Sequence, residues 1–189
     1  MAMEFPDHPF WDFSLGVYGQ AGVPQACLEL QSDHQLDVNI LLYCLWLGAS
    51  GRGTLDAAEM MRVTGSVAEW HEEIVRGLRA VRQRLKGGMP PAPEELSEPL
   101  RAGVQKLEID FEHLEQLMLA AAIERAPDDN ADGESRIRAA LANAGRYFEA
   151  LNVRQSSEDR RNLAILLKAA FEGLDSELVA KICGGLTAA

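Results

Sequence analysis

The segment from Phe10 to Trp46 places polar side chains among aromatic ones, and this is the pattern in the chain most able to support chemistry. A polar group buried among aromatic rings needs a hydrogen-bond partner, because burial without one costs about 1 to 3 kcal/mol. The segment is therefore either a highly specified core or a pocket for a small, flat or acyl ligand. The candidate binding residues in and beyond this segment are Trp11, Asp12, Tyr18, Asn39, Tyr43, Trp46, Trp70, Arg79 and Arg82.

Both interpretations stay open from the sequence, and we favour the core as the simpler one. In a core, the indole rings pack on neighbouring leucines such as Leu41 and Leu45. Asn39 fits a core least well, because it lies in the first turn of the most apolar segment, Val38 to Ala49. Its side chain could instead serve the unpaired N–H groups that begin a helix.

Four basic residues, Arg76, Arg79, Arg82 and Lys86, recur at spacings that bring much of the set to one helical face. Arg79 and Arg82 could anchor an anionic ligand, since guanidinium groups bind phosphate and carboxylate groups well. The alternative is neutralisation by acidic residues of the next helix, which only a short loop separates from the stripe. We favour neutralisation. The acidic residues available are Glu94, Glu95, Glu98 and those that flank the following long helix.

The metal-binding patterns in the chain are incomplete, so we expect no metal and no cofactor. Glu108 and Glu112 are four residues apart in the acidic stretch 108–115 and could share a metal. A di-iron bundle, however, needs Glu-x-x-His elements on two helices, and neither the stretch 108–115 nor the segment 69–73 supplies one. A solvated helix face explains these acids better. Residues 128–133 match the first half of an EF-hand loop, yet Ala139 stands where the closing glutamate belongs. A loop that caps the next helix through Asp132 accounts for the same residues.

Signatures of catalysis are also missing from the sequence. Cys27 and Cys44 have no obvious histidine partner, and Asp12 and Ser14, near His8, point to different sides of a helix. The chain has no dinucleotide fingerprint, no Walker loop and no zinc-protease motif. This favours a protein that is not an enzyme.

Helical periodicity dominates the chain, without a convincing strand signal, and predicts an all-α, single-domain bundle of seven to nine helices over residues 1–189. Asp7 and Asp37 are expected to cap the first and third helices, Thr54 the short helix through Met61, and Ser66 the longer helix from Val67 to Lys86. The segment 38–49, apolar on every side, is expected to be the central helix. The other expected helices cover about 9–19, 24–32, 54–61, 67–86, 94–125, 134–151, 157–172 and 175–184.

Two long segments, 67–86 and 94–125, are predicted to form a central antiparallel hairpin. Apolar residues alternate at spacings of four and three along both, and the loop of Gly and Pro at 87–93 reverses the chain. The flanking charges are basic in the first and acidic in the second, which favours their pairing. We expect residues 1–125 to form a core, with the helices of 134–189 packed on it and on the hairpin. The seam residues are Ile74, Leu78, Val81, Leu85, Leu100, Val104, Leu107, Phe111, Leu114, Met118 and Ala121.

Composition limits the classes of function. The chain has 189 residues, of which 47% are hydrophobic and 25% charged, and this suits one folded domain. A net charge of −11 argues against binding of nucleic acid, which needs a basic face. Three cysteines without a CxxC pair suggest buried thiols in a reducing compartment. The N-terminus lacks a secretory pattern, and no apolar run approaches the ~20 residues that a bilayer requires. We expect a cytoplasmic protein that does not contact membranes.

The run FWDFSLGVYGQAGVPQACLELQ, followed by DVNILLYCLW, resembles a bacterial family of short proteins known as domain of unknown function 2390. The resemblance covers about residues 5–120 and is looser through Trp70 and residues 78–86. It implies a cytoplasmic helical domain and no catalytic residue. It also implies that six residues belong to one spatial unit. That set is Trp11, Asp12, Asn39, Trp46, Arg79 and Arg82.

The sequence favours an intracellular interaction or adaptor protein that binds another protein or forms a homodimer. The long apolar seams and the charge difference between the paired helices motivate this hypothesis. The alternative is a protein or enzyme that binds a small acyl or anionic molecule. It predicts an apolar cavity of at least ~300 Å³ that Arg79 and Arg82 reach.

Overall fold

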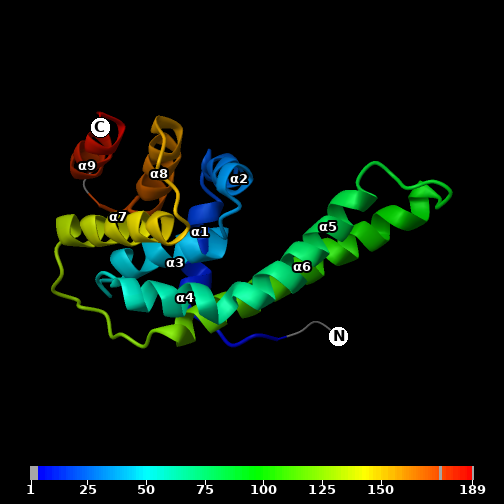
Figure 1. The fold of residues 1–189 in the computed structure, drawn as a ribbon, viewed down its shortest axis with the longest axis horizontal. Coiled ribbons are helices and arrows are strands. Elements are labelled where there is room, and N and C mark those ends of the chain that lie inside the picture. Colours follow the sequence, from blue (N-terminus) through cyan, green and yellow to red (C-terminus); the bar gives the residue numbers. More distant parts are fainter. Residues whose placement is uncertain (1–3, 175, 189) are drawn as a thin grey trace.

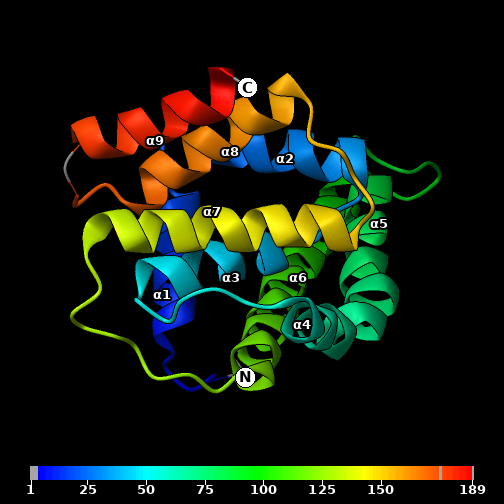
Figure 2. The same ribbon diagram turned by 60° about the vertical axis from the view of Figure 1, so that its left-hand side comes forward.

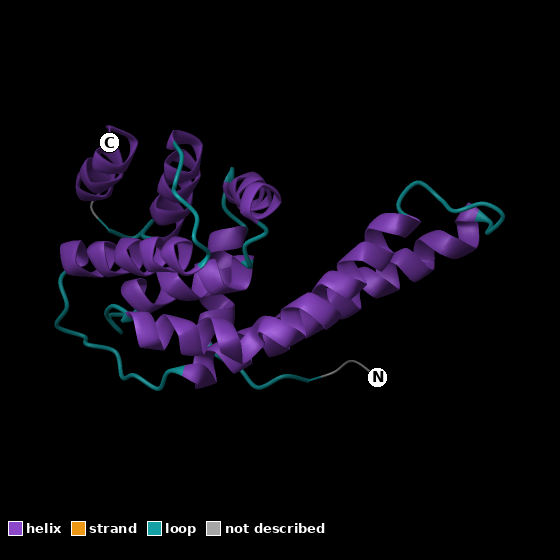
Figure 3. Cartoon of the chain, viewed as in Figure 1, coloured by secondary structure: helices purple, strands orange, loops and turns teal. Residues whose placement is uncertain are grey.

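The computed structural model describes residues 4–174 and 176–188, and all of its regular structure within these ranges is helical (Figures 1 and 3). A body of short helices carries a long arm made of two antiparallel helices. The all-α class and the helical hairpin predicted from the sequence are both confirmed. The helices are α1 (Pro9–Tyr18), α2 (Val23–His34), α3 (Val38–Ala49), α4 (Ala57–Glu69), η1 (Trp70–Val75), α5 (Arg76–Leu85), α6 (Glu94–Ala122), α7 (Gly133–Ala150), α8 (Ser157–Ala170) and α9 (Ser176–Ala188).

Helix α3 is the centre of the body, as its apolar sequence predicts. Ten of its twelve residues are buried, and α1, α6, α7 and α8 all contact it (Figure 2). Asp37 caps its N-terminus, accepting a 2.8 Å hydrogen bond from the Asn39 backbone N–H. Helix α7 crosses closest, at Gly48, where a Cβ would collide with the backbone of Ala140. The close crossing lets two helices bury a large apolar surface against each other.

The C-terminal helices pack on the body and not on the hairpin. Helix α7 packs mainly on α3 and α4, α8 packs on α2 and α9, and the arm extends away from all three (Figure 1). The expectation that these helices cover the hairpin is therefore wrong. The physical reason is that α3 is apolar on every side, so the surface that α1 and α6 leave uncovered must also be removed from water, and α7 and α8 pack on it.

The first helix of the arm is longer than predicted, because α4, η1 and α5 form one continuous run from Ala57 to Leu85. The sequence suggested a break here, with Ser66 as a cap. Ser66 instead lies within the helix, where its hydroxyl donates to the Val63 carbonyl at 2.7 Å. Two other predicted caps are one or two residues off, since His8 and Asp56 cap α1 and α4.

Several seam residues of the arm remain exposed to solvent. Leu100 is 67% exposed, and Val81, Leu107 and Leu114 are also exposed, as is Leu96 outside the seam. Two helices alone cannot enclose each other's apolar sides. Within the described residues, no helix combines the length and apolar character that crossing a bilayer requires.

Candidate functional site: a cavity and a buried polar cluster

A cavity of about 330 Å³ lies where the arm joins the body. Side chains of α1, α2 and α3 form one side, and residues of α5 and α6 at the root of the arm form the other. Leu15, Tyr18, Leu28 and Ile109 line it and are exposed, so the cavity opens to solvent along an apolar rim.

The floor of the cavity carries amide side chains held in a chain of hydrogen bonds. Gln116 donates to the Asn39 side-chain oxygen at 2.8 Å, and the Asn39 amide donates to Glu115 Oε2 at 2.6 Å. All three residues are buried, and Glu115 is 0% exposed. Helix α6 supplies Glu115 and Gln116, so this chain joins the arm to the start of α3.

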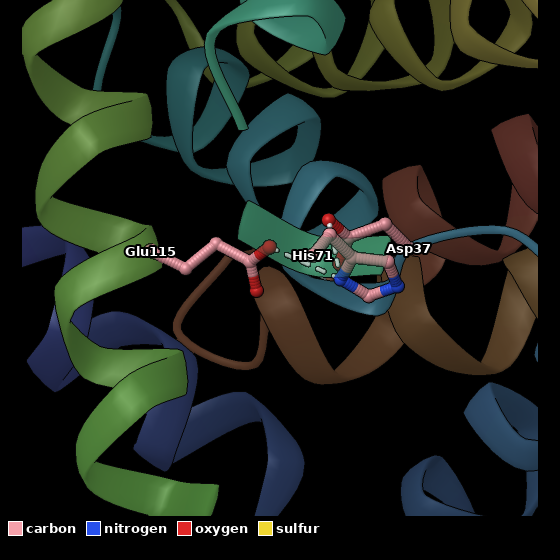
Figure 4. Close-up of side chains that lie close together, drawn as sticks. All are labelled: Asp37, His71 and Glu115. Carbon is pink, nitrogen blue, oxygen red and sulfur yellow. Dashed lines mark hydrogen bonds and ion pairs between the residues drawn. The ribbon is translucent and has the colours of Figure 1, made fainter. Parts of the chain in front are cut away.

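Behind the floor, Asp37, His71 and Glu115 meet (Figure 4). His71 Nδ1 lies 3.2 Å from Asp37 Oδ2 and 3.0 Å from Glu115 Oε1. Burial lowers the pKa of His71, but the Glu115 hydrogen bond and the Asp37 charge outweigh it, so the pKa is raised overall. Burial, reinforced by the nearby Glu115 carboxylate, raises the pKa of Asp37 to about 7. The charges of the three side chains therefore influence one another's protonation.

His71 reaches this cluster from η1, a π-helical turn inside the otherwise α-helical run. A π turn inserts about one extra residue and rotates the side chains that follow it, and such turns occur often at functional sites. The Tyr147 hydroxyl, from α7, accepts a 2.8 Å hydrogen bond from the Asp37 backbone N–H. Elements far apart in the sequence therefore fix the position of Asp37.

Arg79 and Arg82 line the cavity but bind acidic residues of α6. Glu108 accepts from Arg79 Nε at 2.9 Å and from Arg82 Nε at 2.5 Å, and Arg79 also donates to Glu112 at 2.6 Å. Burial raises the pKa of Glu108, but the two guanidinium groups outweigh it and hold the pKa below its usual value. Burial raises the pKa of Glu112. The neutralisation of the basic stripe predicted from the sequence is therefore present at its two central residues.

Three buried polar atoms of lining residues have no hydrogen-bond partner among the described residues. They are Ser14 Oγ in α1, Asp37 Oδ2 at the cap of α3 and Gln116 Oε1 in α6. Buried polar atoms are nearly always paired, so unpaired ones beside a cavity mark a place where another group can bind.

The structure brings some of the predicted binding residues together and separates others from the cavity. Trp11, Tyr18, Asn39, Arg79 and Arg82 line it. The remaining four do not line it. They are Asp12, which is exposed on α1, Tyr43 and Trp46, which pack with Phe10 in the core, and Trp70, which stacks on Phe111 and donates to its carbonyl.

Several residues of the site were not identified from the sequence. His71, Glu115 and Gln116 were missed, and Asp37 was assigned only a capping role. The expectation that acidic residues of 108–115 form a solvated face is wrong for Glu108 and Glu115, which are buried. The one local signal was Asn39, a polar residue at the start of an apolar helix. Its partners are 76 and 77 residues away in sequence, so no spacing pattern could reveal them.

Comparison with known proteins supports the family suggested by the opening motif. No curated protein and no solved structure matches the chain. A family model described as "Protein of unknown function (DUF2390)" matches residues 9–119, which include every residue that lines the cavity and the three residues of the buried cluster. The chain therefore belongs to the DUF2390 family of proteins of unknown function.

Proposed function

We propose that this protein binds an uncharged small molecule in the cavity between the arm and the body. The cavity volume of about 330 Å³ supports this, because small-molecule sites measure roughly 300 to 1,000 Å³. Its apolar rim suits the hydrocarbon part of a ligand. The buried thiols of Cys27, Cys44 and Cys183 fit a reducing compartment and thus a cytoplasmic protein.

The observation that carries this proposal is the unpaired Gln116 Oε1 at the floor of the cavity. An amide oxygen can only accept a hydrogen bond, so the ligand has an N–H or O–H group at its buried end. Ser14 Oγ can donate to or accept from the same end. The ligand is therefore an amphiphilic molecule with a hydrogen-bonding head and an apolar tail.

Charge decides against an anionic ligand. Arg79 and Arg82, which could have anchored an anion, bind Glu108 and Glu112 instead. Asp37 adds a further acidic group to the lining. An anion would have to displace a carboxylate from a guanidinium group, and breaking such a pair without replacement is costly.

Octanamide and its N,N-dimethyl derivative test the proposal, because they share a tail and only octanamide has an N–H donor. Isothermal titration of the full chain should give saturable binding of octanamide at one site per chain. The dimethyl derivative should bind at least ~10-fold more weakly, since it leaves Gln116 Oε1 unpaired.

A variant that fills the cavity controls this experiment. Val38→Trp places a bulky ring on a half-buried lining residue and should abolish octanamide binding. Met61→Trp, on an exposed position of α4 outside the lining, should leave binding unchanged. Equal affinity of the two amides, or binding that survives Val38→Trp, would contradict the proposal.

We infer a second function for the arm, as a surface that binds another protein or a second copy of the chain. The exposed apolar residues Leu96, Leu100 and Leu107 support it, because their spacings of four and seven residues put them on one face of α6, and monomers rarely expose a large contiguous apolar patch. Val81 is exposed on the neighbouring α5. An arm that stands away from the body is accessible to a partner from several sides (Figure 1).

Light scattering after size-exclusion chromatography, together with affinity capture from cells, tests this second function. We expect a dimer or a captured partner that is lost in the double variant Leu100→Asp with Leu107→Asp. Met61→Asp, equally exposed but on α4, is the matched control. A strict monomer that captures no partner would refute the adaptor role.

A further inference from the structure

Three side-chain atoms of metal-ligating type converge behind the cavity. They are Asp37 Oδ2, His71 Nδ1 and Glu115 Oε1, and all lie within 4.8 Å of one another. Each comes from a separate element, namely the cap of α3, the π turn η1 and the middle of α6 (Figure 4). Three independent elements thus direct a nitrogen and two oxygens at one point.

The separations fit a coordination sphere. Transition metals bind imidazole nitrogen and carboxylate oxygen at about 2.0 to 2.2 Å, so neighbouring ligands of one ion lie roughly 3.0 to 3.6 Å apart. The histidine nitrogen lies 3.0 Å from Glu115 and 3.2 Å from Asp37. The two carboxylate oxygens lie within 4.8 Å of each other, so they must approach by at most about 1.2 Å to reach the same spacing.

One carboxylate oxygen that faces the cluster, Asp37 Oδ2, has no hydrogen-bond donor among the described residues. A single ring nitrogen carries one proton and can direct it well at only one of the two carboxylates. It forms a hydrogen bond with Glu115, whereas Asp37 Oδ2 accepts none from the described residues although Asp37 is only 5% exposed. Two buried carboxylates side by side repel each other when both are ionised, and either a proton on Asp37 or a divalent ion in the cluster removes that repulsion.

Asn39 orients both carboxylates towards the same point. Its backbone N–H holds Asp37 Oδ1 at 2.8 Å, and its side chain holds Glu115 Oε2 at 2.6 Å. Each carboxylate therefore has one oxygen fixed outside the cluster and the other directed into it. This is how metal sites commonly orient their ligands from outside the coordination sphere.

We propose that Asp37, His71 and Glu115 bind one divalent transition-metal ion per chain, through Oδ2, Nδ1 and Oε1. A set of one imidazole and two carboxylates suits Zn²⁺, Mn²⁺, Fe²⁺ or Co²⁺. It is unsuited to Ca²⁺, which takes six to eight oxygen ligands. Three protein ligands leave a coordination position for water or for an exogenous group. The proposal involves different atoms from the amide site and does not depend on it.

Metal titration of the full chain tests this site. Protein freed of metal with a chelator is dialysed against Zn²⁺, and bound metal is measured by elemental analysis, with Mg²⁺ as the negative probe. We expect one Zn²⁺ per chain and a higher melting temperature with Zn²⁺ than with Mg²⁺. Co²⁺ in place of Zn²⁺ should give a visible d–d absorption band in the wild-type chain, a readout that needs no variant.

Variants assign the ligands. His71→Gln and Glu115→Gln should each weaken Zn²⁺ binding at least ~100-fold, because each removes a direct ligand. His34→Gln is the matched control, since His34 contacts one carboxylate, Asp159 at 2.7 Å, and is not part of the cluster. Sub-stoichiometric Zn²⁺ in the wild type, no Co²⁺ band, or equal binding by His34→Gln and His71→Gln would overturn the proposal.

Discussion

Glu108 clamps the two helices of the arm, and its removal tests how the arm is held at its root. Glu108 is 5% exposed and accepts three hydrogen bonds, one from Arg79 and two from Arg82. Glu108→Gln keeps the shape of the side chain but removes its charge. It also turns an amide N–H₂ towards at least one guanidinium group, where a donor faces a donor.

The size of the effect follows from the burial of both partners. Breaking a buried ion pair costs about 3 to 5 kcal/mol, and a single hydrogen bond to a charged group contributes about 1.5 to 3 kcal/mol. The side chains of Arg79 and Arg82 are 20% and 26% exposed, so water compensates them in part when Glu108 is lost. We therefore expect Glu108→Gln to lower the free energy of unfolding by about 2 to 3 kcal/mol at pH 7.

The effect should depend on pH in a defined direction. The pKa of Glu108 in the folded chain lies below its usual value, which is about 4.3 for an unperturbed glutamate. Its charge therefore stabilises the fold fully above pH ~4.3, and this contribution is lost as pH falls through the lower folded pKa. The difference between wild type and variant should shrink over the same interval.

Urea unfolding followed by circular dichroism at pH 7, 5 and 4 measures both effects. Glu98→Gln is the control, because Glu98 pairs with Arg101 on the exposed surface of the same helix, where water screens the pair, and should change stability much less than Glu108→Gln. A Glu108→Gln effect no larger than that of Glu98→Gln at pH 7 would refute the reasoning. So would an effect that grows as the pH falls.

Three further predictions follow from single positions in the body. Gly48→Ala should lower the melting temperature and reduce the free energy of unfolding by about 3 kcal/mol, because the new Cβ would collide with the Ala140 backbone. Gly16→Ala, in open space on α1, should instead raise the free energy of unfolding by up to about 1 kcal/mol. Thermal melts that rank the two variants otherwise would contradict the close crossing of α3 and α7. Asn143→Ala should lower the free energy of unfolding in urea by about 2 to 4 kcal/mol, since this fully buried amide makes three hydrogen bonds that tie α7 to Cys44 of α3 and to the loop after α3. A loss below about 1 kcal/mol would argue against that role. Burial raises the pKa of Cys27 to about 12, so a thiol reagent at pH 8 should label Cys27 in urea but not in the native protein, and rapid native labelling would disprove its burial.

Local chemistry in the sequence was enough to predict most helices of this protein. The apolar run of 38–49, with Asp37 before it, predicted a capped central helix, and the Gly and Pro loop at 87–93 predicted the reversal of the arm. These features depend on neighbours within a few residues, where periodicity and capping operate. The break expected near Ser66 failed because its hydroxyl could be satisfied within the helix as well as at a helix end.

The sequence also predicted some of the residues that line the cavity. Trp11, Tyr18, Asn39, Arg79 and Arg82 were selected because polar or charged groups recurred near aromatic ones, and the fold brings all five to one cavity. Tyr43 and Trp46 share the same local pattern and lie in the core. The pattern could not separate the two groups, because which side of a helix faces a cavity depends on the helices around it.

What only the tertiary structure decided is the pairing of charges and amides across long sequence distances. His71 lies in the π turn η1, and Glu115 and Gln116 look like residues of a solvated acidic helix until packing against α3 buries them. Local propensity is set by neighbours along the chain, whereas burial and hydrogen-bond partners are set by packing. The sequence by itself therefore determined a helical body with an antiparallel arm, and the packing of α6 and η1 against the start of α3 determined where its cavity and its buried Asp37, His71 and Glu115 cluster lie.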